Sequence, residues 1–286
     1  MSNFKGAGVA LVTPFNSDKS IDYAGLERVI EHVIEGGVDY LVVLGTTGET
    51  ATLSNSEKKD VLAYSINVNQ GRLPIVFGLG GNSTNTLLEE IKETDFSGVD
   101  AILSVSPYYN KPTQGGIIAH YKAVADNSPV PVILYNVPGR TMSNVTAEST
   151  LELSKHENII GIKESSGNLE QCMHIAAKKP KDFLLISGDD MQGSVIKAIG
   201  GEGLISVMAN AYPAIIRAIV NGGQEESIKS TFKLLEINPL MYAESNPVGI
   251  KCLMKLIDIC EDEVRLPLLK ASDSLKNQIK KAYIHI

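Results

Sequence analysis

The fold is decided by two runs of sequence, which read Tyr135-Asn136-Val137-Pro138-Gly139-Arg140-Thr141 and Ile159-Ile160-Gly161-Ile162-Lys163-Glu164-Ser165-Ser166. Residues 132–135 are apolar and stop before a Pro-Gly pair, which is typical of a buried strand that ends at Tyr135. The second run has the same design. Because side chains alternate along a strand, Lys163 is expected on the face of Ile159 and Gly161. The other two isoleucines, Ile160 and Ile162, are expected on the opposite face.

Lys163 is the chemically distinctive residue of this pair of strands. It ends a buried strand above a glycine, Gly161, which is expected to leave room for the lysine side chain. A confined, partly dry position disfavours the charged ammonium, so Lys163 is a candidate amine nucleophile that forms a Schiff base with a ketone. The alternative is a strand-end lysine that points into solvent. The nearby Tyr135 and Arg140 favour the catalytic interpretation.

Apolar runs recur along the chain with amphipathic segments between them, and none alternates cleanly, as expected for parallel strands covered by helices. The predicted strands are 9–13, 40–44, 75–78, 101–105, 132–135, 159–163, 184–187 and 204–207. The predicted helices include one after Asp22, one opened by a capping box at Ser54 and Glu57, and 84–97, 116–127, 146–155, 168–178, 191–199 and 213–222. This order predicts an α/β TIM (β/α)8 barrel, assigned to residues 1–223. Residues 224–286 are predicted to form a C-terminal helical extension, with helices at 225–236, 247–257 and 272–282.

Composition excludes several classes of protein. The 286 residues are 43% hydrophobic and carry a formal net charge of −7 with scattered basic residues, which argues against a nucleic-acid partner. No run has the length of a membrane span, and the start lacks the basic region of a secretory signal. The three cysteines lack C-x-x-C spacing, so free thiols and a cytoplasmic location are expected. The five histidines show no ligand spacing, so no metal is expected. Asp189-Asp190 is expected to cap a helix.

A third motif, Gly45-Thr46-Thr47-Gly48-Glu49, precedes the two runs. The three motifs together resemble the pyruvate-dependent class I lyases of the N-acetylneuraminate lyase superfamily. Within them, the chain most resembles the dihydrodipicolinate synthase family, from about Gly6 to the last helix. This resemblance implies condensation of pyruvate with L-aspartate 4-semialdehyde to 4-hydroxy-tetrahydrodipicolinate, the first committed step of lysine and diaminopimelate biosynthesis. It also implies no cofactor, and a homotetramer built as a dimer of dimers, or a dimer.

The resemblance assigns catalytic roles to four residues. It implies Lys163 as the Schiff-base lysine, and Tyr135 with Thr47 as a proton relay. Tyr109 would join this relay from a neighbouring subunit. Phenol and hydroxyl groups suit that role because they pass protons without placing a fixed negative charge beside the iminium. The alternative for Tyr108-Tyr109 is a pair of ordinary packing aromatics.

The resemblance also assigns substrate contacts. Thr46 and Thr47 would hold the pyruvate carboxylate, and Gly188 and Ile205 would line the pyruvate end. Arg140 would bind the carboxylate of aspartate semialdehyde, a role that suits a planar bidentate donor.

Two other functions compete with this interpretation. N-acetylneuraminate lyases and 2-keto-3-deoxy sugar acid aldolases share the lysine and the tyrosine but usually lack Gly-Arg-Thr after the proline. Gly139-Arg140-Thr141 therefore favours a second substrate with a nearby carboxylate. The alternative outside the enzymes is an inactive barrel that binds an amino acid as a sensor or scaffold. The presence of Lys163 and Tyr135 counts against it.

Family members that are inhibited by lysine bind it at a dimer interface, and the resemblance carries that site onto a set of residues here. They are Thr50, Ala51, Asn55, Lys58, Asn82, Thr86 and Tyr108. Sensitive members typically have a glutamate where this chain has Thr86. Lys58 adds a positive charge where a cationic ligand would bind. A degenerate allosteric site with little inhibition by lysine is therefore expected.

Overall fold

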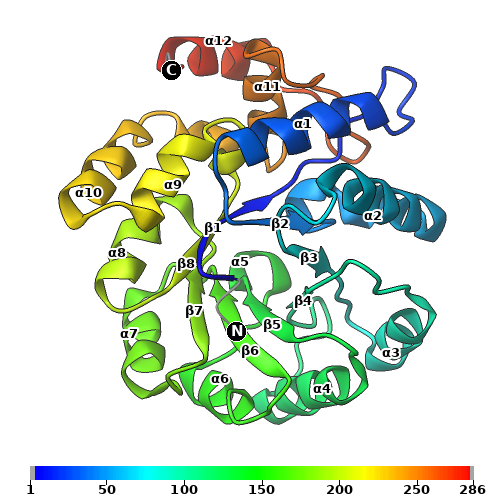
Figure 1. Cartoon of the computed structure of the whole chain (residues 1–286), viewed down its shortest axis with the longest axis vertical. Coiled ribbons are helices and arrows are strands. Elements are labelled where there is room, and N and C mark those ends of the chain that lie inside the picture. Colours follow the sequence, from blue (N-terminus) through cyan, green and yellow to red (C-terminus); the bar gives the residue numbers. More distant parts are fainter. Residues whose placement is uncertain (1–3, 284–286) are drawn as a thin grey trace.

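The computed structural model describes residues 4–283, and within this range eight parallel strands close into a barrel (Figure 1). Each strand pairs with the next in the chain, and β8 pairs with β1. The strands are β1 (Gly6–Ala10), β2 (Tyr40–Val43), β3 (Ile75–Gly78), β4 (Ala101–Val105), β5 (Val132–Asn136), β6 (Ile159–Glu164), β7 (Leu184–Ser187) and β8 (Gly203–Ser206). The predicted TIM barrel is confirmed.

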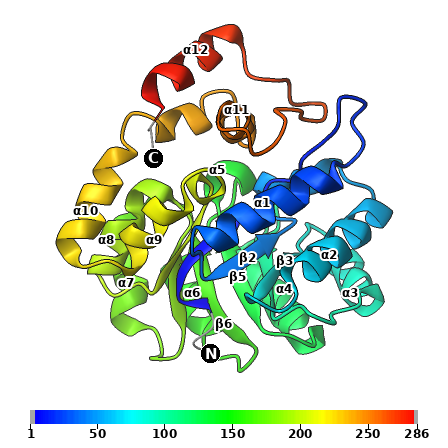
Figure 2. The same cartoon turned by 45° about the horizontal axis from the view of Figure 1, so that its top comes forward.

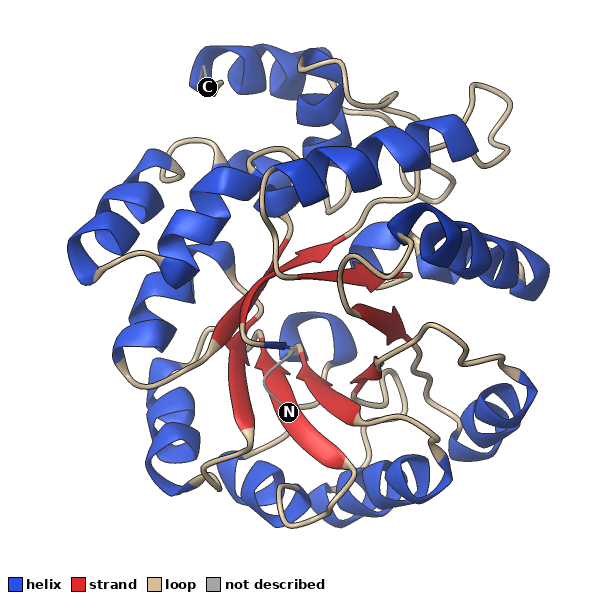
Figure 3. Cartoon of the chain, viewed as in Figure 1, coloured by secondary structure: helices blue, strands red, loops and turns tan. Residues whose placement is uncertain are grey.

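Helices surround the strands on the outside, as the colouring by secondary structure makes clear (Figure 3). Those of the barrel are α1 (Tyr23–Glu35), α2 (Asn55–Asn69), α3 (Thr84–Glu93), α4 (Gln114–Asn127), α5 (Pro138–Thr141), α6 (Ala147–Leu153), α7 (Leu169–Lys178), α8 (Gly193–Ala198) and α9 (Pro213–Asn221). Side-chain caps define several of their starts. Ser54 and Glu57 form the predicted capping box at α2, and Asn168 caps α7.

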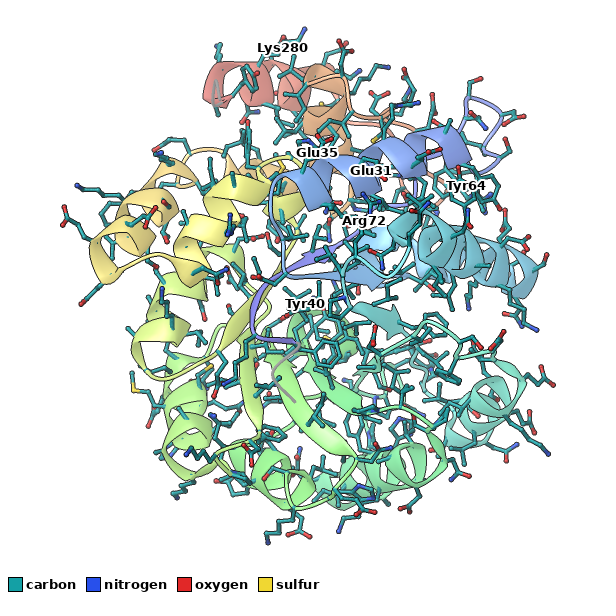
Figure 4. The ribbon with its side chains drawn as sticks, viewed as in Figure 1. Glu31, Glu35, Tyr40, Tyr64, Arg72 and Lys280 are labelled. Carbon is teal, nitrogen blue, oxygen red and sulfur yellow. The ribbon has the colours of Figure 1, made fainter. Side chains whose placement is uncertain are left out.

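The core has two layers. Strand side chains that point outward pack against the helices, and those that point inward form a second apolar cluster that includes Val42, Ile133 and Ile186. Tyr40 belongs to the inner cluster and lies inside the ring of strands (Figure 4). Gly8 leaves room for it, since a Cβ there would lie 2.3 Å from Cε2 of Tyr40. The barrel interior is therefore filled by side chains, and the open space lies at the strand ends.

The chain continues after the barrel with α10 (Gln224–Lys233), α11 (Val248–Leu256) and α12 (Asp273–Ala282). Helix α11 packs on the turn Met208–Asn210 that follows β8, so it lies at the C-terminal end of the barrel. Figure 2 shows α11 and α12 together beyond α1, away from the start of the chain. The division of the chain at residues 223 and 224 stays a prediction. No helix within residues 4–283 has the length and apolar character needed to cross a bilayer.

Several element boundaries differ from the prediction, and three of the differences are instructive. The first strand is Gly6–Ala10 rather than 9–13, because the chain after Leu11 turns away and Thr13 bonds the carbonyl of Gly48. Helix α3 ends at Glu93 rather than at residue 97, because the next residue, Thr94, has an extended backbone. The predicted helix 191–199 is a 3₁₀ turn over 190–192 followed by α8.

The predicted alternation along β6 is wrong at Ile159 and Ile160: Ile159 packs outward with Ile162 and does not share the face of Lys163. The register between β5 and β6 shifts after Val132, so that Ile133 pairs with Gly161 instead of Ile160. Ile160 consequently joins the inner cluster, whereas Ile162 packs outward against the helices. A one-residue irregularity of this kind reverses the facing of the residues before it and leaves those after it unchanged. Lys163 therefore still points into the barrel.

Candidate active site

Lys163 and Tyr135 lie side by side at the C-terminal end of the barrel. They are register partners on β6 and β5, and the lysine Nζ lies 4.3 Å from the centre of the tyrosine ring. Lys163 is 6% exposed and Tyr135 is 7% exposed. Ile205 on β8 is buried in the same inner cluster. The structure thus places a buried primary amine beside a phenol, with an apolar wall around them.

The space for the Lys163 side chain comes from Gly188, which follows β7. A Cβ at Gly188 would lie 2.8 Å from the lysine Cε and 3.0 Å from its Cγ. The expectation that Gly161 provides this room is wrong: a Cβ at Gly161 would lie 2.8 Å from the carbonyl oxygen of Leu184. Gly161 therefore allows β6 and β7 to approach each other, and Gly188 leaves room for the lysine side chain.

Thr46 and Thr47 form a 3₁₀ turn with Gly48 directly after β2. Thr47 is 2% exposed, and its Oγ1 accepts a hydrogen bond of 2.9 Å from Nδ2 of Asn246. The opposite side of the turn is fixed by Thr13, which donates to the carbonyl of Gly48 at 2.7 Å. The hydroxyl and backbone N–H groups of the turn are therefore held in a defined position at the strand end.

A cavity of about 380 Å³ opens above these residues, and Thr46, Tyr135 and Arg140 are among the residues that line it. Lys163, Thr47, Gly188 and Ile205 do not line it, whereas Tyr135 both lines the cavity and contacts the lysine. Arg140 is exposed on α5, and its guanidinium makes no hydrogen bond or ion pair with another described residue. Its guanidinium is free to bind an anion that enters this cavity.

Tyr109 does not reach the site within its own chain. Its side chain is 87% exposed, and its backbone is held in the left-handed region with φ of 73°. The backbone N–H of Tyr109 donates to the carbonyl of Thr141, at 3.4 Å, so the loop is tied to α5 beside Arg140. Tyr108, which is 40% exposed, lines the cavity itself. Tyr109 is thus not an ordinary packing aromatic within this chain.

A buried polar cluster behind β6 was not predicted. Glu164, next to the lysine, points outward and accepts hydrogen bonds from Nδ2 of Asn136 at 3.0 and 3.1 Å. It also accepts from Gln171 on α7 at 2.8 Å and from the N–H of Ser166 at 2.7 Å. These bonds fix the ends of β5 and β6, and hence the strand positions that carry Tyr135 and Lys163. The sequence signal for this cluster is the polar residue at the end of each predicted strand, Asn136 after residue 135 and Glu164 after residue 163.

Asp189 and Asp190 have different roles. Asp189 caps the 3₁₀ turn after β7 through Met191 N–H at 2.9 Å, as predicted. Asp190 does not act as a cap: it is 1% exposed and accepts hydrogen bonds from Ser206 Oγ and from the N–H of Val207. Burial raises the pKa of Asp190 to about 6, and the bond from Ser206 opposes this shift. Asp190 thus joins the ends of β7 and β8.

A second cavity, of about 440 Å³, contains most of the residues predicted for a degenerate allosteric site. They are Asn55, Lys58, Asn82, Thr86 and Tyr108, whereas Thr50 and Ala51 line the first cavity. Glu90, one turn after Thr86 on α3, was missed. Its carboxylate lies 3.9 Å from Nζ of Lys58, so the positive charge of this lysine is partly balanced within the cavity.

The fold and the site together define a class of protein. A (β/α)8 barrel that buries a lysine amine and a phenol at the C-terminal ends of adjacent strands is the arrangement of a class I, Schiff-base aldolase. Within residues 4–283 there is no group of three or more histidine, cysteine, aspartate or glutamate side chains that could hold a metal ion.

The chain belongs to the dihydrodipicolinate synthetase family, whose model matches residues 3–285. It is 48% identical over 290 residues to a 4-hydroxy-tetrahydrodipicolinate synthase of Cytophaga hutchinsonii, covering 100% of this chain and 98% of that protein. The structure also resembles the dihydrodipicolinate synthase of Cyanidioschyzon merolae solved with lysine bound, with a TM-score of 0.94 at 35% identity over 99% and 98% of the two chains. That of Acinetobacter baumannii, complexed with pyruvate, gives a TM-score of 0.93 at 34% identity over 98% and 99%.

Proposed function

We propose that this protein is a 4-hydroxy-tetrahydrodipicolinate synthase, which condenses pyruvate with L-aspartate 4-semialdehyde. The observation that carries the proposal is the buried Lys163 amine, 4.3 Å from the centre of the Tyr135 ring and below a cavity that a free arginine lines. Membership of the family supports the same activity. The product would feed the synthesis of diaminopimelate and lysine.

The chemistry follows from an amine next to proton-transfer groups. The Lys163 amine adds to C2 of pyruvate, and after proton transfers the C2 oxygen leaves as water, which gives an imine. Loss of a proton from C3 gives an enamine, whose C3 attacks the aldehyde carbon of the semialdehyde while the aldehyde oxygen takes up a proton. The amino group of the new chain then attacks the imine carbon, closes the ring and releases Lys163 as a free amine.

Tyr135 and Thr47 are the groups of this chain that would move protons in these steps. Thr46 and Thr47 would bind the pyruvate carboxylate, Gly188 and Ile205 would line the pyruvate end of the site, and Arg140 would bind the carboxylate of the semialdehyde. Tyr109 would complete the relay of a neighbouring subunit, which its exposure of 87% supports. A homotetramer built from two such dimers is part of the proposal. The buried, unpaired thiols of Cys172, Cys252 and Cys260 support a reducing compartment, the cytoplasm.

The activity is tested by mixing the purified protein with pyruvate and aspartate semialdehyde. We expect both substrates to be consumed in equal amounts, with a carbon–carbon bond between pyruvate C3 and the aldehyde carbon visible by NMR with ¹³C-labelled pyruvate. N-acetylneuraminate and a 2-keto-3-deoxy sugar acid are assayed in parallel. Faster turnover of either compound would replace this proposal with the corresponding aldolase activity.

Lysine is expected to inhibit this protein weakly. The second cavity has Thr86 where a glutamate would bind the α-ammonium of lysine, and a lost charged hydrogen bond costs about 1.5–3 kcal/mol, or roughly ten- to more than a hundredfold in affinity. Glu90 reduces the repulsion expected from Lys58, so the prediction rests mainly on Thr86. Titration of lysine at saturating pyruvate checks it, and half-inhibition below about 1 mM, roughly −4 kcal/mol of binding, would contradict it. Thr86→Glu is expected to increase the inhibition.

A further inference from the structure

A fully buried ion pair connects the helical extension to the turn after β2. Lys251 on α11 and Glu49, which directly follows the turn Thr46–Gly48, lie 2.5 Å apart from Nζ to Oε1, with side chains that are 0% and 2% exposed. The lysine Nζ also donates to the carbonyl of Glu263, at 2.8 Å. Burial lowers the pKa of Lys251, and Glu49 opposes that shift. Moving two charges out of water costs about as much as their attraction returns, so net stability alone does not account for this pair.

The carboxylate of Glu49 is held on both oxygens by residues that lie more than 200 positions later in the chain. Oε1 accepts from Lys251, 202 positions away, and Oε2 accepts from the backbone N–H of Arg265 at 3.0 Å, 216 positions away. The ring of Phe15 packs against both cations, 4.2 Å from Nζ of Lys251 and 4.5 Å from Cζ of Arg265. Glu49 is therefore held by two residues of the helical extension, which themselves pack on Phe15.

The backbone of Glu49 needs such a lock. Its φ of 54° and ψ of 32° lie in the left-handed region, which is unfavourable for residues with a side chain. Glu49 ends the turn, and its N–H donates to the carbonyl of Thr46 at 3.1 Å. If the carboxylate is released, the backbone can relax toward ordinary angles, and that relaxation moves the hydroxyl and N–H groups of Thr46 and Thr47.

Asn246 makes a second connection from the extension to the same turn, through its bond of 2.9 Å to Oγ1 of Thr47. Two successive parts of the extension, Asn246 and Lys251, thus contact two positions of the turn, Thr47 and Glu49. This double attachment fixes the position of the turn relative to the barrel. Thr46 of the turn and Asn246 of the extension both line the first cavity.

We propose that Lys251 and Glu49 are positioning residues, which hold the turn Thr46–Gly48 in the conformation that binds the pyruvate carboxylate. The inference rests on the proposed function, because it takes Thr46 and Thr47 as the pyruvate-binding residues. Lys251, which does not line the cavity, then sets the affinity for pyruvate without touching the substrate. Its effect on the aldehyde subsite is expected to be small, because Arg140 is carried by α5 and not by the turn.

The experiment compares the variants Lys251→Met and Glu49→Gln with a matched ion pair that lies at the other end of the barrel. Lys179 and Glu202 are 2.5 Å apart with side chains 8% and 17% exposed, next to the starts of β7 and β8. We expect the KM for pyruvate to rise at least about tenfold in Lys251→Met and in Glu49→Gln, since small displacements of positioning groups have effects of this size. The KM for the semialdehyde should change less than about threefold, and Lys179→Met should leave both within about twofold.

Two further variants leave no unpaired charge in the interior, so they test the inference even if Lys251→Met does not fold. They are the double variant Glu49→Gln with Lys251→Met, and Asn246→Ala. Both should raise the KM for pyruvate at least about threefold, while borohydride at saturating pyruvate still labels Lys163. An unchanged KM for pyruvate, an equal rise in Lys179→Met, or a loss confined to kcat would overturn the inference. Failure of pyruvate to label the unmodified protein would instead refute the proposed function.

Discussion

Replacing Lys163 with alanine is expected to abolish covalent binding of pyruvate and to lower kcat by at least about 10³-fold, or roughly 4 kcal/mol of transition-state stabilisation. The reason is geometric as well as chemical. Lys163 points into the barrel, 6% exposed and beside Tyr135, and Gly188 leaves space for its side chain. Two other lysines lie near this end of the barrel, but Lys58 faces Glu90 at 3.9 Å and Lys251 is buried in its pair with Glu49, so neither is expected to take over the attack.

The measurement is reduction with borohydride in the presence of pyruvate, followed by peptide mass spectrometry. The unmodified protein should gain one reduced pyruvyl group on the peptide that contains Lys163, and the alanine variant should gain none. Lys179→Ala is the matched control, because Lys179 is also poorly exposed but lies at the opposite end of the strands. Labelling on another lysine, or equal labelling of the alanine variant, would show that the Schiff-base mechanism has been assigned to the wrong residue.

The architecture could be predicted because strand and helix periodicities are local properties of the sequence. Eight apolar runs separated by amphipathic segments are compatible with few folds, and strand ends converge in a barrel wherever the exact boundaries lie. Lys163 and Tyr135 could be placed at the C-terminal end of the barrel because each ends a predicted strand. Errors of three residues at β1 and four at the end of α3 did not change which residues reach the C-terminal end.

The features that the sequence could not provide depend on contacts between distant segments. The register shift that turns Ile160 inward exists only when β5 and β6 are paired, and no local pattern encodes it. In the same way, the role of Gly188 depends on the path of the Lys163 side chain across the neighbouring strand. Glu49 belongs to the motif Gly45–Glu49, but its partner Lys251 is 202 positions away and has no distinguishing sequence context.

The allosteric cavity shows the same limit on a smaller scale. Lys58 was interpreted from its own charge, whereas the structure places Glu90 from another helix 3.9 Å from its Nζ. The net charge of a cavity depends on all the groups that face it, and here these include Glu90 as well as Lys58. The presence of Glu90 does not change the fact that Thr86 stands where lysine-sensitive members have a glutamate. The expectation of weak inhibition by lysine therefore rests on Thr86.

Arg140→Ala is expected to reduce kcat/KM for aspartate semialdehyde by about 30- to 1000-fold, which corresponds to a loss of roughly 2–4 kcal/mol. Arg140 is exposed on α5 at the rim of the cavity and has no partner among the described residues, so its charge is available to a substrate carboxylate. The residue lies outside the pocket that surrounds Lys163. Covalent trapping of pyruvate should therefore remain within about twofold of the unmodified protein.

Two further variants show whether the planar guanidinium itself is required. Arg140→Lys keeps the charge but loses the bidentate geometry, and should recover only part of the lost kcat/KM. Arg72→Ala removes an exposed arginine that pairs with Glu31 at 2.5 Å on the outside of the barrel, labelled in Figure 4, and should leave catalysis unchanged. Equal losses in pyruvate trapping and in use of the semialdehyde would mean that Arg140 supports the whole site. A loss seen only with the semialdehyde would assign Arg140 to its carboxylate and set this protein apart from lyases that act on sugar acids.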